Sequence, residues 1–212
     1  MTSEKVCTNH KDDRSKIIRR CLVCLLISAL ILLIIFLLAW AILKPQGPTF
    51  TLEDATIFTV NVSSPYVISI AVQVTVNSRN PNSNIGIYYE NLDVYATYQN
   101  QQVTYYTAIP PVYQGGRDFN VWCPYIYGEN VPVAPYNGVA LSESVAEGGI
   151  VLTVKIIGHI KWRIGSFVTG RYYLHVTCPP AYIPIGNSIN TGIVSGDRVI
   201  NSQLSRDCRV SI

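Results

Sequence analysis

The 212-residue sequence is poor in the side chains that enzymes use for acid–base and nucleophilic chemistry. It has three histidines, and only His159 and His175 lie beyond residue 44. The patterns G-x-S-x-G, H-E-x-x-H and G-x-x-x-x-G-K-[ST] do not occur. The acidic residues are dispersed, whereas metal ligands cluster. We therefore predict no enzymatic activity, no cofactor and no metal site. A pocket that placed His159 or His175 beside a serine or a carboxylate would favour an enzyme instead.

The large C-terminal part of the chain also lacks net charge. The whole chain carries a formal charge of +3, and residues 1–20, with six basic and three acidic side chains, account for all of it. Residues 44–212 carry ten side chains of each sign. A nucleic-acid-binding domain needs a concentrated basic face, so we expect no nucleic-acid partner.

One long run without charge is present. Residues 21–43, CLVCLLISALILLIIFLLAWAIL, form a stretch of 23 uncharged residues. A helix needs about 20 residues to cross the roughly 30 Å of bilayer hydrocarbon. A helix of a soluble core is apolar on one face only. The run therefore predicts a transmembrane helix.

The flanking charges predict its orientation, since basic residues near a span stay on the cytoplasmic side. Six basic residues precede the run and only Lys44 follows it closely. The N-terminus is therefore expected in the cytoplasm and residues 44–212 outside. A cleaved signal peptide is the alternative, because Ala39-Trp40-Ala41 fits a cleavage pattern. Secretory apolar cores run about 7 to 15 residues, so an uncleaved signal anchor fits this longer run better.

The cysteines divide at the same place. Cys21 and Cys24 lie at the cytoplasmic end of the run, where thiols are candidates for S-acylation. Cys123, Cys178 and Cys208 fall in the oxidising compartment, where pairing is favoured. We expect a Cys178–Cys208 disulfide, which would close a tail rich in Gly, Asn and Ser, and a buried free thiol at Cys123. Spacing alone leaves the other pairings open.

Alternation of apolar residues predicts strands in residues 44–212. Every second residue of 67–76 is apolar, with the polar residues between them, and the pattern returns after a bend at Asn80-Pro81-Asn82. Residues 99–102 read as a turn, Gly158 as the place of a bulge, and residues 141–147 as a short helix. The expected inward positions are Ile68, Ile70, Val72, Val74, Val76, Ile85, Ile87, Tyr89, Leu92, Val94, Ala96, Tyr98, Ile150, Leu152, Val154, Ile156, Ile160, Trp162, Ile164, Tyr172, Leu174, Val176 and Cys178. Strands joined by turns, with inward and outward residues alternating, predict an antiparallel sandwich.

Several of these motifs together resemble the plant harpin-induced-like (NHL) family. The resemblance begins near residue 15 and rests on the span and on four stretches. These are Asn80-Pro81-Asn82 with Ile85, Ile87 and Tyr88-Tyr89 behind it, Tyr113-Gln114-Gly115-Gly116, Lys161-Trp162-Arg163-Ile164-Gly165, and a Tyr-rich strand that ends at Cys178. It implies a late-embryogenesis-abundant group-2 (WHy) domain, an all-β immunoglobulin/fibronectin-III-like antiparallel sandwich. It also implies a plasma-membrane or plasmodesmal location and a part in plant defence or stress responses. The family has no agreed catalytic activity.

The resulting organisation has five parts. We expect a basic cytoplasmic tail (1–20), a signal-anchor helix (21–43), a juxtamembrane segment with the first strand (44–65), the sandwich (66–180) and a C-terminal tail packed on it (181–212).

The Asn80-Pro81-Asn82 motif is expected to make a turn. Asn80 precedes a proline and is pushed toward extended angles, Pro81 fixes its own φ, and Asn82 tolerates left-handed geometry. The two asparagines would then bond backbone groups and be unavailable to a ligand. A Pro81→Ala variant should lose expression or stability.

Three surface features are candidates for contact with other molecules. His159, Lys161 and Arg163 would share one strand face and make a basic stripe for phospholipid or cell-wall polyanions, or simply a solvated face. Asn61-Val62-Ser63 is a glycosylation sequon in the expected outer compartment. Exposed tyrosines could recognise sugar or protein, although half of them should belong to the core; they are Tyr105, Tyr106, Tyr125, Tyr127 and Tyr136.

Three functions are consistent with these features. The first is a non-catalytic membrane-anchored module that acts in defence or stress signalling through contacts with other membrane or apoplastic proteins, with self-association left open. The second is a binder of lipid, of another apolar ligand in the sandwich interior, or of cell-wall glycan on its tyrosines. The third is an enzyme.

Overall fold

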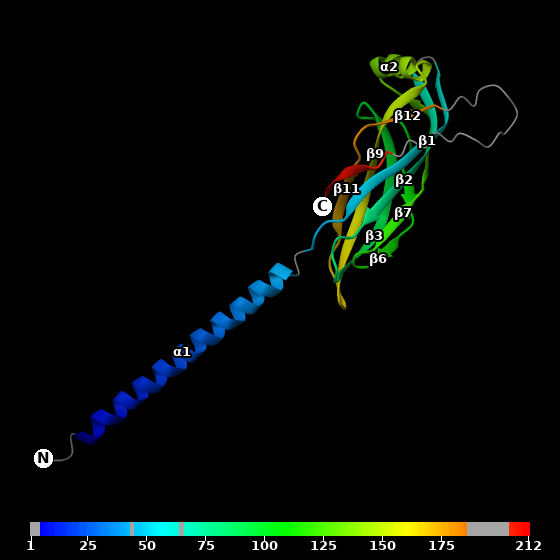
Figure 1. Cartoon of the computed structure of the whole chain (residues 1–212). Coiled ribbons are helices and arrows are strands. Elements are labelled where there is room, and N and C mark those ends of the chain that lie inside the picture. The colour runs from blue at the N-terminus through cyan, green and yellow to red at the C-terminus, as the bar shows by residue number, and fades with distance from the viewer. Residues whose placement is uncertain (1–4, 43–44, 64–65, 186–203) are drawn as a thin grey trace. The chain divides into compact units, whose positions relative to one another are not determined.

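The computed structural model describes residues 5–42, 45–63, 66–185 and 204–212. The chain divides into two compact units, Met1–Lys44 and Pro45–Ile212. Each unit is described by itself (Figure 1).

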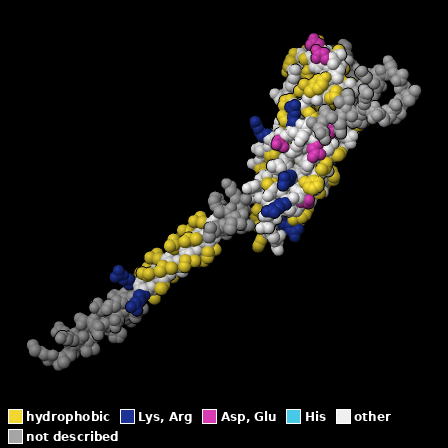
Figure 2. Space-filling view, in the orientation of Figure 1, with side chains coloured by type: hydrophobic (Ala, Val, Ile, Leu, Met, Phe, Trp, Pro, Cys, Tyr) yellow, Lys and Arg dark blue, Asp and Glu magenta, His cyan; other side chains and the backbone are white. Residues whose placement is uncertain are grey.

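The first unit is the helix α1, Lys5–Ile42. Its apolar section, Ile18–Leu37, is long enough to cross a membrane, and every side chain in it is exposed. Figure 2 shows hydrophobic side chains along most of this section, which also contains Arg19 and Arg20 near its start. A helix that is apolar on all sides and covered by nothing in its own unit is suited to lipid rather than to water. The helix begins well before residue 21, so the expected cytoplasmic tail is helical from Lys5 onward.

The second unit is an antiparallel β-sandwich, as the alternation predicts. One layer holds β1 (Thr49–Ser63), β2 (Val67–Arg79), β7 (Phe119–Trp122) and β8 (Tyr125–Pro132). The other layer is built on β3 (Ile85–Tyr98), β9 (Gly149–Ile164) and β11 (Tyr172–Thr177). Short strands extend this second layer: β4 (Gln101–Gln102), β5 (Thr107–Ile109), β6 (Val112–Gln114), β10 (Phe167–Val168) and β12 (Ala181–Pro184).

The strand β13 (Arg206–Ser211) joins the two layers, because it pairs with β1 on one side and with β11 on the other. A disulfide between Cys178 and Cys208 connects the residue after β11 to β13. Segments from both ends of the unit, β1 and β13, are therefore hydrogen-bonded members of the sheet. Residues 186–203 of the expected tail lie outside the described residues.

The core lies between the layers. The alternate residues of β2 and β9 named above are buried, apart from the partly buried Ile164, and the polar residues between them face outward. Aromatic rings connect the layers: the Tyr89 ring on β3 meets the Phe50 ring on β1 at 6.1 Å and the Trp122 ring on β7 at 5.4 Å, both edge-on. Edge-to-face packing of this kind adds to the free energy gained by burying the rings.

The bulge expected at Gly158 belongs to the partner strand instead. β9 keeps its alternation without a break, whereas β3 shifts register between Glu90 and Asp93. Asn91 takes a positive φ of 45° there. A Cβ on Gly158 would come within 2.6 Å of the Asn91 carbonyl oxygen, so the glycine makes room for a bulge in its neighbour.

Two other local expectations need correction. The short helix, α2, runs from Pro135 to Ala146, six residues longer at its start than the expected 141–147. Its first turn holds Asn137 and Gly138, which are poor helix formers, and Pro135 stands in the first turn, where proline is tolerated. Tyr172, expected to face inward, is exposed near the start of β11.

Candidate functional site

The Asn80-Pro81-Asn82 turn is held by a network of buried amide hydrogen bonds. The Asn80 Nδ2 donates to the carbonyl oxygens of Ile85 (2.7 Å) and Gly115 (2.8 Å). Its Oδ1 accepts from the backbone N–H of Asn82 at 3.0 Å, which is an Asx turn. Asn80 is fully buried, so these bonds satisfy a side chain that water cannot reach.

The second asparagine of the motif holds the start of the unit. The Asn82 Nδ2 donates to the Gln46 carbonyl at 2.7 Å, and the Asn82 Oδ1 accepts from the Gln46 N–H at 2.9 Å. The side-chain amide thus pairs with the peptide of Gln46 as a neighbouring strand would. Both asparagines use their side-chain amides for hydrogen bonds within the protein. The motif therefore holds the turn and the start of the unit together.

A second buried group extends this network into the core. The Tyr89 hydroxyl donates to Gln114 Oε1 and lies 2.8 Å from Ser78 Oγ, and Gln114 Nε2 donates to the carbonyls of Ser78 and Asp118. Burial raises the pKa of the Tyr89 phenol well above its ordinary value, and the Ser78 hydrogen bond only partly offsets this. Tyr89 therefore remains a neutral structural hydrogen-bonding group.

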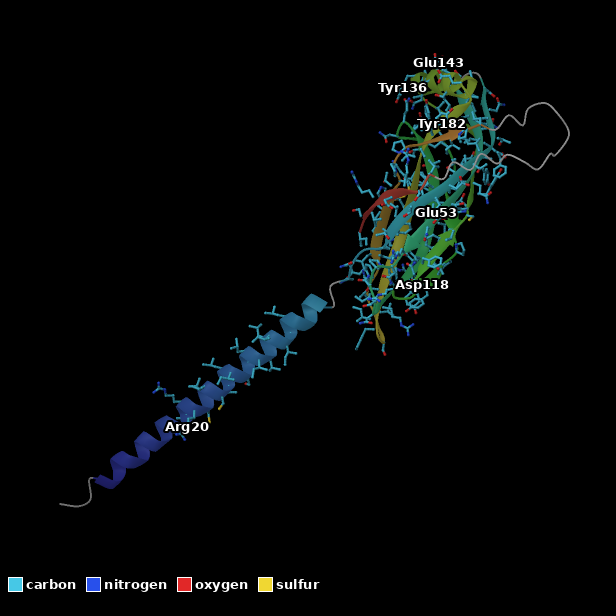
Figure 3. The ribbon with its side chains drawn as sticks, in the orientation of Figure 1. Arg20, Glu53, Asp118, Tyr136, Glu143 and Tyr182 are labelled. Atoms are coloured by element: carbon cyan, nitrogen blue, oxygen red, sulfur yellow. A yellow bond between two sulfur atoms is a disulfide. The ribbon has the colours of Figure 1, made fainter. Side chains whose placement is uncertain are left out.

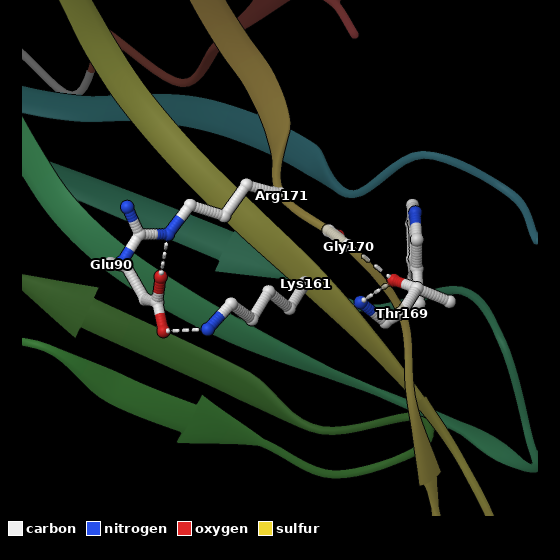
Figure 4. Close-up of polar contacts among 6 residues, drawn as sticks. Glu90, Lys161, Thr169, Gly170 and Arg171 are labelled. Carbon is white, nitrogen blue, oxygen red and sulfur yellow. Dashed lines mark hydrogen bonds and ion pairs between the residues drawn. The ribbon is translucent and has the colours of Figure 1, made fainter.

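The basic stripe exists, and one of its cations, Lys161, is paired with an acidic side chain. His159, Lys161 and Arg163 project from the outer side of β9. The Lys161 Nζ lies 2.7 Å from Glu90 Oε1, and the Arg171 Nε lies 3.1 Å from the other oxygen of Glu90 (Figure 4). The hydrogen bond from Lys161 is the main reason why the pKa of Glu90 lies below its ordinary value. The His159 ring packs edge-on against Tyr173.

All five tyrosines named from the sequence are exposed, so the expectation that half belong to the core is wrong. Three of them, Tyr105, Tyr125 and Tyr127, lie on the outer face of the layer that contains β8. The Tyr105 and Tyr127 rings meet edge-on at 5.7 Å, and the Tyr125 ring packs on the Phe58 ring of β1, also at 5.7 Å. Tyr106 instead packs on Tyr95 of β3, and Tyr136 lies on α2.

The tyrosines of β8 line an open depression of about 480 Å³, which we call the tyrosine groove. Its floor is formed by the small residues Ser69 and Ala71 of β2, which lie between the taller side chains of β1 and β8. The groove offers aromatic rings, hydroxyls and one carboxylate. Its lining residues are Thr59, Ser69, Ile70, Ala71, Tyr125, Tyr127, Gly128 and Glu129.

The remaining candidates lie on the surface. Asn61 is exposed on β1 and pairs with Ser69 of the groove floor. Cys21 and Cys24 are exposed on α1. Cys123 is a free but exposed thiol, so its expected burial is wrong. The reason is strand alternation, because Trp122 points into the core and the next residue must point out.

Among the described residues, the hydrogen-bond and ring contacts of the two histidines of the unit include no serine and no carboxylate. The His175 Nε2 lies 3.1 Å from Thr177 Oγ1 on the same strand, and neither histidine lines the tyrosine groove. In the described part of the chain, no three His, Cys, Asp or Glu side chains come together as metal ligands.

The family model "Late embryogenesis abundant protein" matches residues 75–178, which run from β2 to the disulfide at Cys178. NDR1/HIN1-like protein 1 of Arabidopsis thaliana is 45% identical over 98% of this chain and 100% of its own length. The chain belongs to the NDR1/HIN1-like family. Two further members from the same plant, NDR1/HIN1-like proteins 12 and 26, are 44% and 38% identical over 86% and 76% of this chain, and over the same shares of their own lengths.

The family assignment confirms the resemblance read from the sequence. It identifies the chain as a plant stress- and defence-related protein with a late embryogenesis abundant domain. Among solved structures, a protein from Archaeoglobus fulgidus overlaps with a TM-score of 0.34 at 12% identity, over 63% of this chain and 96% of that chain, which supports no conclusion about function.

Proposed function

We propose that this protein is a single-pass plasma-membrane protein with a cytoplasmic N-terminus, which presents a non-catalytic β-sandwich to the apoplast and acts in plant defence or stress through protein contacts. One observation carries the proposal: an apolar helix with no buried residue in Ile18–Leu37 is followed by a separate compact unit that contains a disulfide. The helix suits a bilayer. The disulfide suits an oxidising compartment.

The orientation can be tested by protease protection on sealed right-side-out vesicles. We expect external protease to digest the Pro45–Ile212 unit and to leave a short helical fragment. A glycosidase should increase the gel mobility of the intact chain, and an Asn61→Gln variant should show no such shift. Digestion of the unit only after the vesicles are opened would contradict the proposal.

The tyrosine groove is the surface that we assign to partner contact. Tyrosine supplies a large contact area at a low cost in side-chain entropy and is enriched where proteins bind. Proximity labelling at the plant cell surface should recover partners that are lost from a Tyr125→Ala/Tyr127→Ala variant and kept by Tyr136→Ala. Partners that do not depend on the outer unit at all would argue against this function.

A cell-wall glycan in the same groove is the second candidate, favoured by the combination of rings, hydroxyls and one carboxylate in an open groove. Binding of wall oligosaccharides to the purified protein, lost in the same double variant, would select this candidate. The version with an apolar ligand inside the sandwich has less support, because the inward residues pack against one another in one buried cluster. Residence in plasmodesmata remains a prediction, to be tested by imaging a tagged chain.

A further inference from the structure

One end of the Pro45–Ile212 unit, which we call the loop end, is formed by three adjacent turns. They are residues 80–84, 115–118 and 165–166. The Asn80 N–H donates to the Asp118 carbonyl at 3.0 Å, and the Arg117 N–H donates to the Asn82 carbonyl at 2.8 Å. Residues from all three turns line a shallow depression of about 320 Å³: Ser83, Asn84, Gly86, Tyr113, Gly116, Arg163 and Gly165.

The loop end exposes large apolar side chains. Phe167, in β10 just after the third turn, is 81% exposed, more than any other large hydrophobic residue that the structure describes. Val168 beside it and Phe119, which pairs with Arg79 at the second turn, are also exposed. Apolar surface in water is unfavourable by about 25 cal/mol per Å². Phe167, Val168 and Phe119 together place exposed apolar surface at this end of the unit, and exposed apolar patches mark surfaces that contact other molecules.

The loop end is also basic, although the unit as a whole is formally neutral. Residues 79–84, 115–119 and 163–168 contain Arg79, Arg117 and Arg163 against the single acid Asp118. Residues 128–148, which include α2, contain Glu129, Glu143 and Glu147 and no Lys or Arg. Figure 3 shows Glu143 on α2 at one end of the unit and Asp118 toward the other. The charges are thus separated along the unit.

Arg163 is held in a fixed position at the loop end. Its Nε donates to the Gly165 carbonyl at 3.1 Å, one terminal nitrogen donates to the Tyr88 hydroxyl at 3.3 Å, and its guanidinium lies over the Tyr113 ring at 5.4 Å. The other terminal nitrogen takes no part in these contacts. A pre-oriented guanidinium is suited to a phosphate oxygen.

The connection to α1 indicates what covers this end. Gln46 is hydrogen-bonded to Asn82 of the first turn, and it lies only four positions after Ile42, the last residue of α1. Four extended residues span at most about 14 Å. If α1 crosses the bilayer, as proposed above, chain length alone keeps the loop end within reach of the outer headgroups.

We propose that the loop end docks on the phospholipid surface of the membrane that α1 crosses. The arginines contact headgroup phosphates, and Phe167 enters the boundary between headgroups and acyl chains, where aromatic side chains are favoured. This inference rests on the proposed membrane anchoring. It fixes which end of the sandwich faces the membrane and leaves the acidic α2 end facing away.

The test uses the full-length chain reconstituted in phosphatidylcholine vesicles. Cys7, Cys21, Cys24 and Cys123 are replaced by serine, and a nitroxide is attached at Phe167→Cys or, as a matched control, at Tyr136→Cys on α2, which is 71% exposed. Power-saturation spectra compare accessibility to oxygen, which concentrates in lipid, with accessibility to a water-soluble nickel chelate. We expect the label at 167 to favour oxygen by at least threefold relative to the label at 136.

Three outcomes would overturn the docking. The label at 167 could be as accessible to nickel as the label at 136, it could be shielded from both reagents as in a protein contact, or it could be unaffected by Arg117→Glu/Arg163→Glu. We expect that double variant to move the label into water, and Glu143→Lys to leave it unchanged, with near-ultraviolet circular dichroism showing that each variant is folded.

Flotation after an alkaline wash separates the two proposals. A chain that does not float with the vesicles contradicts the anchor and, with it, the docking. A floating chain with a water-exposed label at 167 contradicts the docking alone.

Discussion

At the scale of single residues, the polar side chains of the Asn80-Pro81-Asn82 turn and of the core network beside it are hydrogen-bonded within the protein. They are therefore not available to a ligand. Asn80, Ser78 and Gln114 are fully buried and hydrogen-bonded. Net stabilisation from one such hydrogen bond is about 1 kcal/mol, but leaving its partner unpaired inside the protein costs about 1 to 3 kcal/mol. Substitutions in the network should therefore affect folding before they affect any function.

Asn80→Ala is the sharpest test of the network. It removes two bonds to carbonyl oxygens and two that Asn80 Oδ1 accepts from the backbone N–H and the side-chain Nδ2 of Asn82, so we expect the free energy of unfolding to fall by about 3 kcal/mol or more. Urea unfolding of the Pro45–Ile212 fragment measures this. Asn84→Ala, exposed in the same turn, should stay within about 0.5 kcal/mol. Pro81→Ala should fall between them, at about 1 kcal/mol, because it acts mainly on the unfolded chain. Equal effects of all three would contradict the role given to Asn80.

Gly115 and Gly116 provide a matched pair of neighbours. A Cβ on Gly116 would lie 2.1 Å from the Ser83 carbonyl oxygen, a backbone atom that cannot move away alone, whereas a Cβ on Gly115 has nothing closer than 3.9 Å. We expect Gly116→Ala to lower the unfolding free energy by about 2 kcal/mol or more and Gly115→Ala to change it by less than about 1 kcal/mol. Thermal unfolding followed by circular dichroism would compare them, and a more harmful Gly115→Ala would contradict the turn geometry.

At the scale of elements, β13 is the strand on which the joining of the layers depends. It is short, and it is tied to the chain before it by the Cys178–Cys208 bridge, across a separation of 30 residues. It stands between β11 and β1, so its loss would open the sandwich along one side. The bridge therefore stabilises a pairing that six residues alone would hold weakly.

Removal of that bridge should be costly. Cys178→Ala/Cys208→Ala should lower the unfolding free energy by about 3 to 4 kcal/mol, which is the chain-entropy value for a loop of this length. Guanidinium unfolding under oxidising conditions measures the effect. Cys123→Ser is the control, because an exposed thiol outside the bridge should matter by less than about 0.5 kcal/mol. A neutral double variant would show that backbone pairing alone holds β13.

Glu90 connects β3 to β9 and to the residue before β11, and it gives the sandwich a pH dependence. Lys161, and to a lesser extent Arg171, favour the charged carboxylate in the folded state, so its pKa lies below its ordinary value of 4.5. A lowered folded pKa contributes stability that is present above 4.5 and is lost as the pH falls through the folded value. We expect Glu90→Gln to flatten the loss of stability below pH 4.5. Parallel acid titrations of the two proteins would detect this, and identical acid profiles would contradict it.

At the scale of the whole molecule, the chain combines a helix suited to lipid with a sandwich that forms a separate compact unit. The sandwich has one continuous core, and its first and last strands meet where β1 pairs with β13. The family match covers residues 75–178, which leaves out β1 and β13. The family model is therefore shorter than the unit that the paired strands form.

Fragment boundaries test this difference. A fragment of residues 45–212, made in an oxidising compartment, should fold and unfold in one cooperative transition. A fragment of residues 66–180 should not, because it exposes the edge of β2 that β1 covers and the edge of β11 that β13 covers. Calorimetry and hydrogen exchange would distinguish them. A stable shorter fragment would show that the joining strands are dispensable.

The apolar helix and the inward faces of the long strands were predictable from the sequence, because both are encoded in patterns of neighbouring residues. The run from Cys21 onward indicates a membrane helix, and the alternation of Ile68 with Ser69 assigns faces to β2. The Trp122–Cys123 pair shows where prediction from local pattern fails, because the phase of a short strand is set by what packs on it. The tyrosines of β8 are exposed because none of the described elements covers them.

Only the tertiary structure decided which distant residues meet. The Gln46 peptide lies against Asn82, Gly158 faces a bulge in β3, and Arg163, Arg117 and Arg79 gather at one end of a formally neutral unit. No periodicity encodes these contacts, since each depends on strand register and on turns that bring together residues far apart in the chain. The sequence by itself determined that there is a helix long and apolar enough to cross a membrane, and a β-sandwich. The tertiary structure decided which end of the sandwich is basic and apolar and which end is acidic, because charge separation in a folded domain is a property of positions in space.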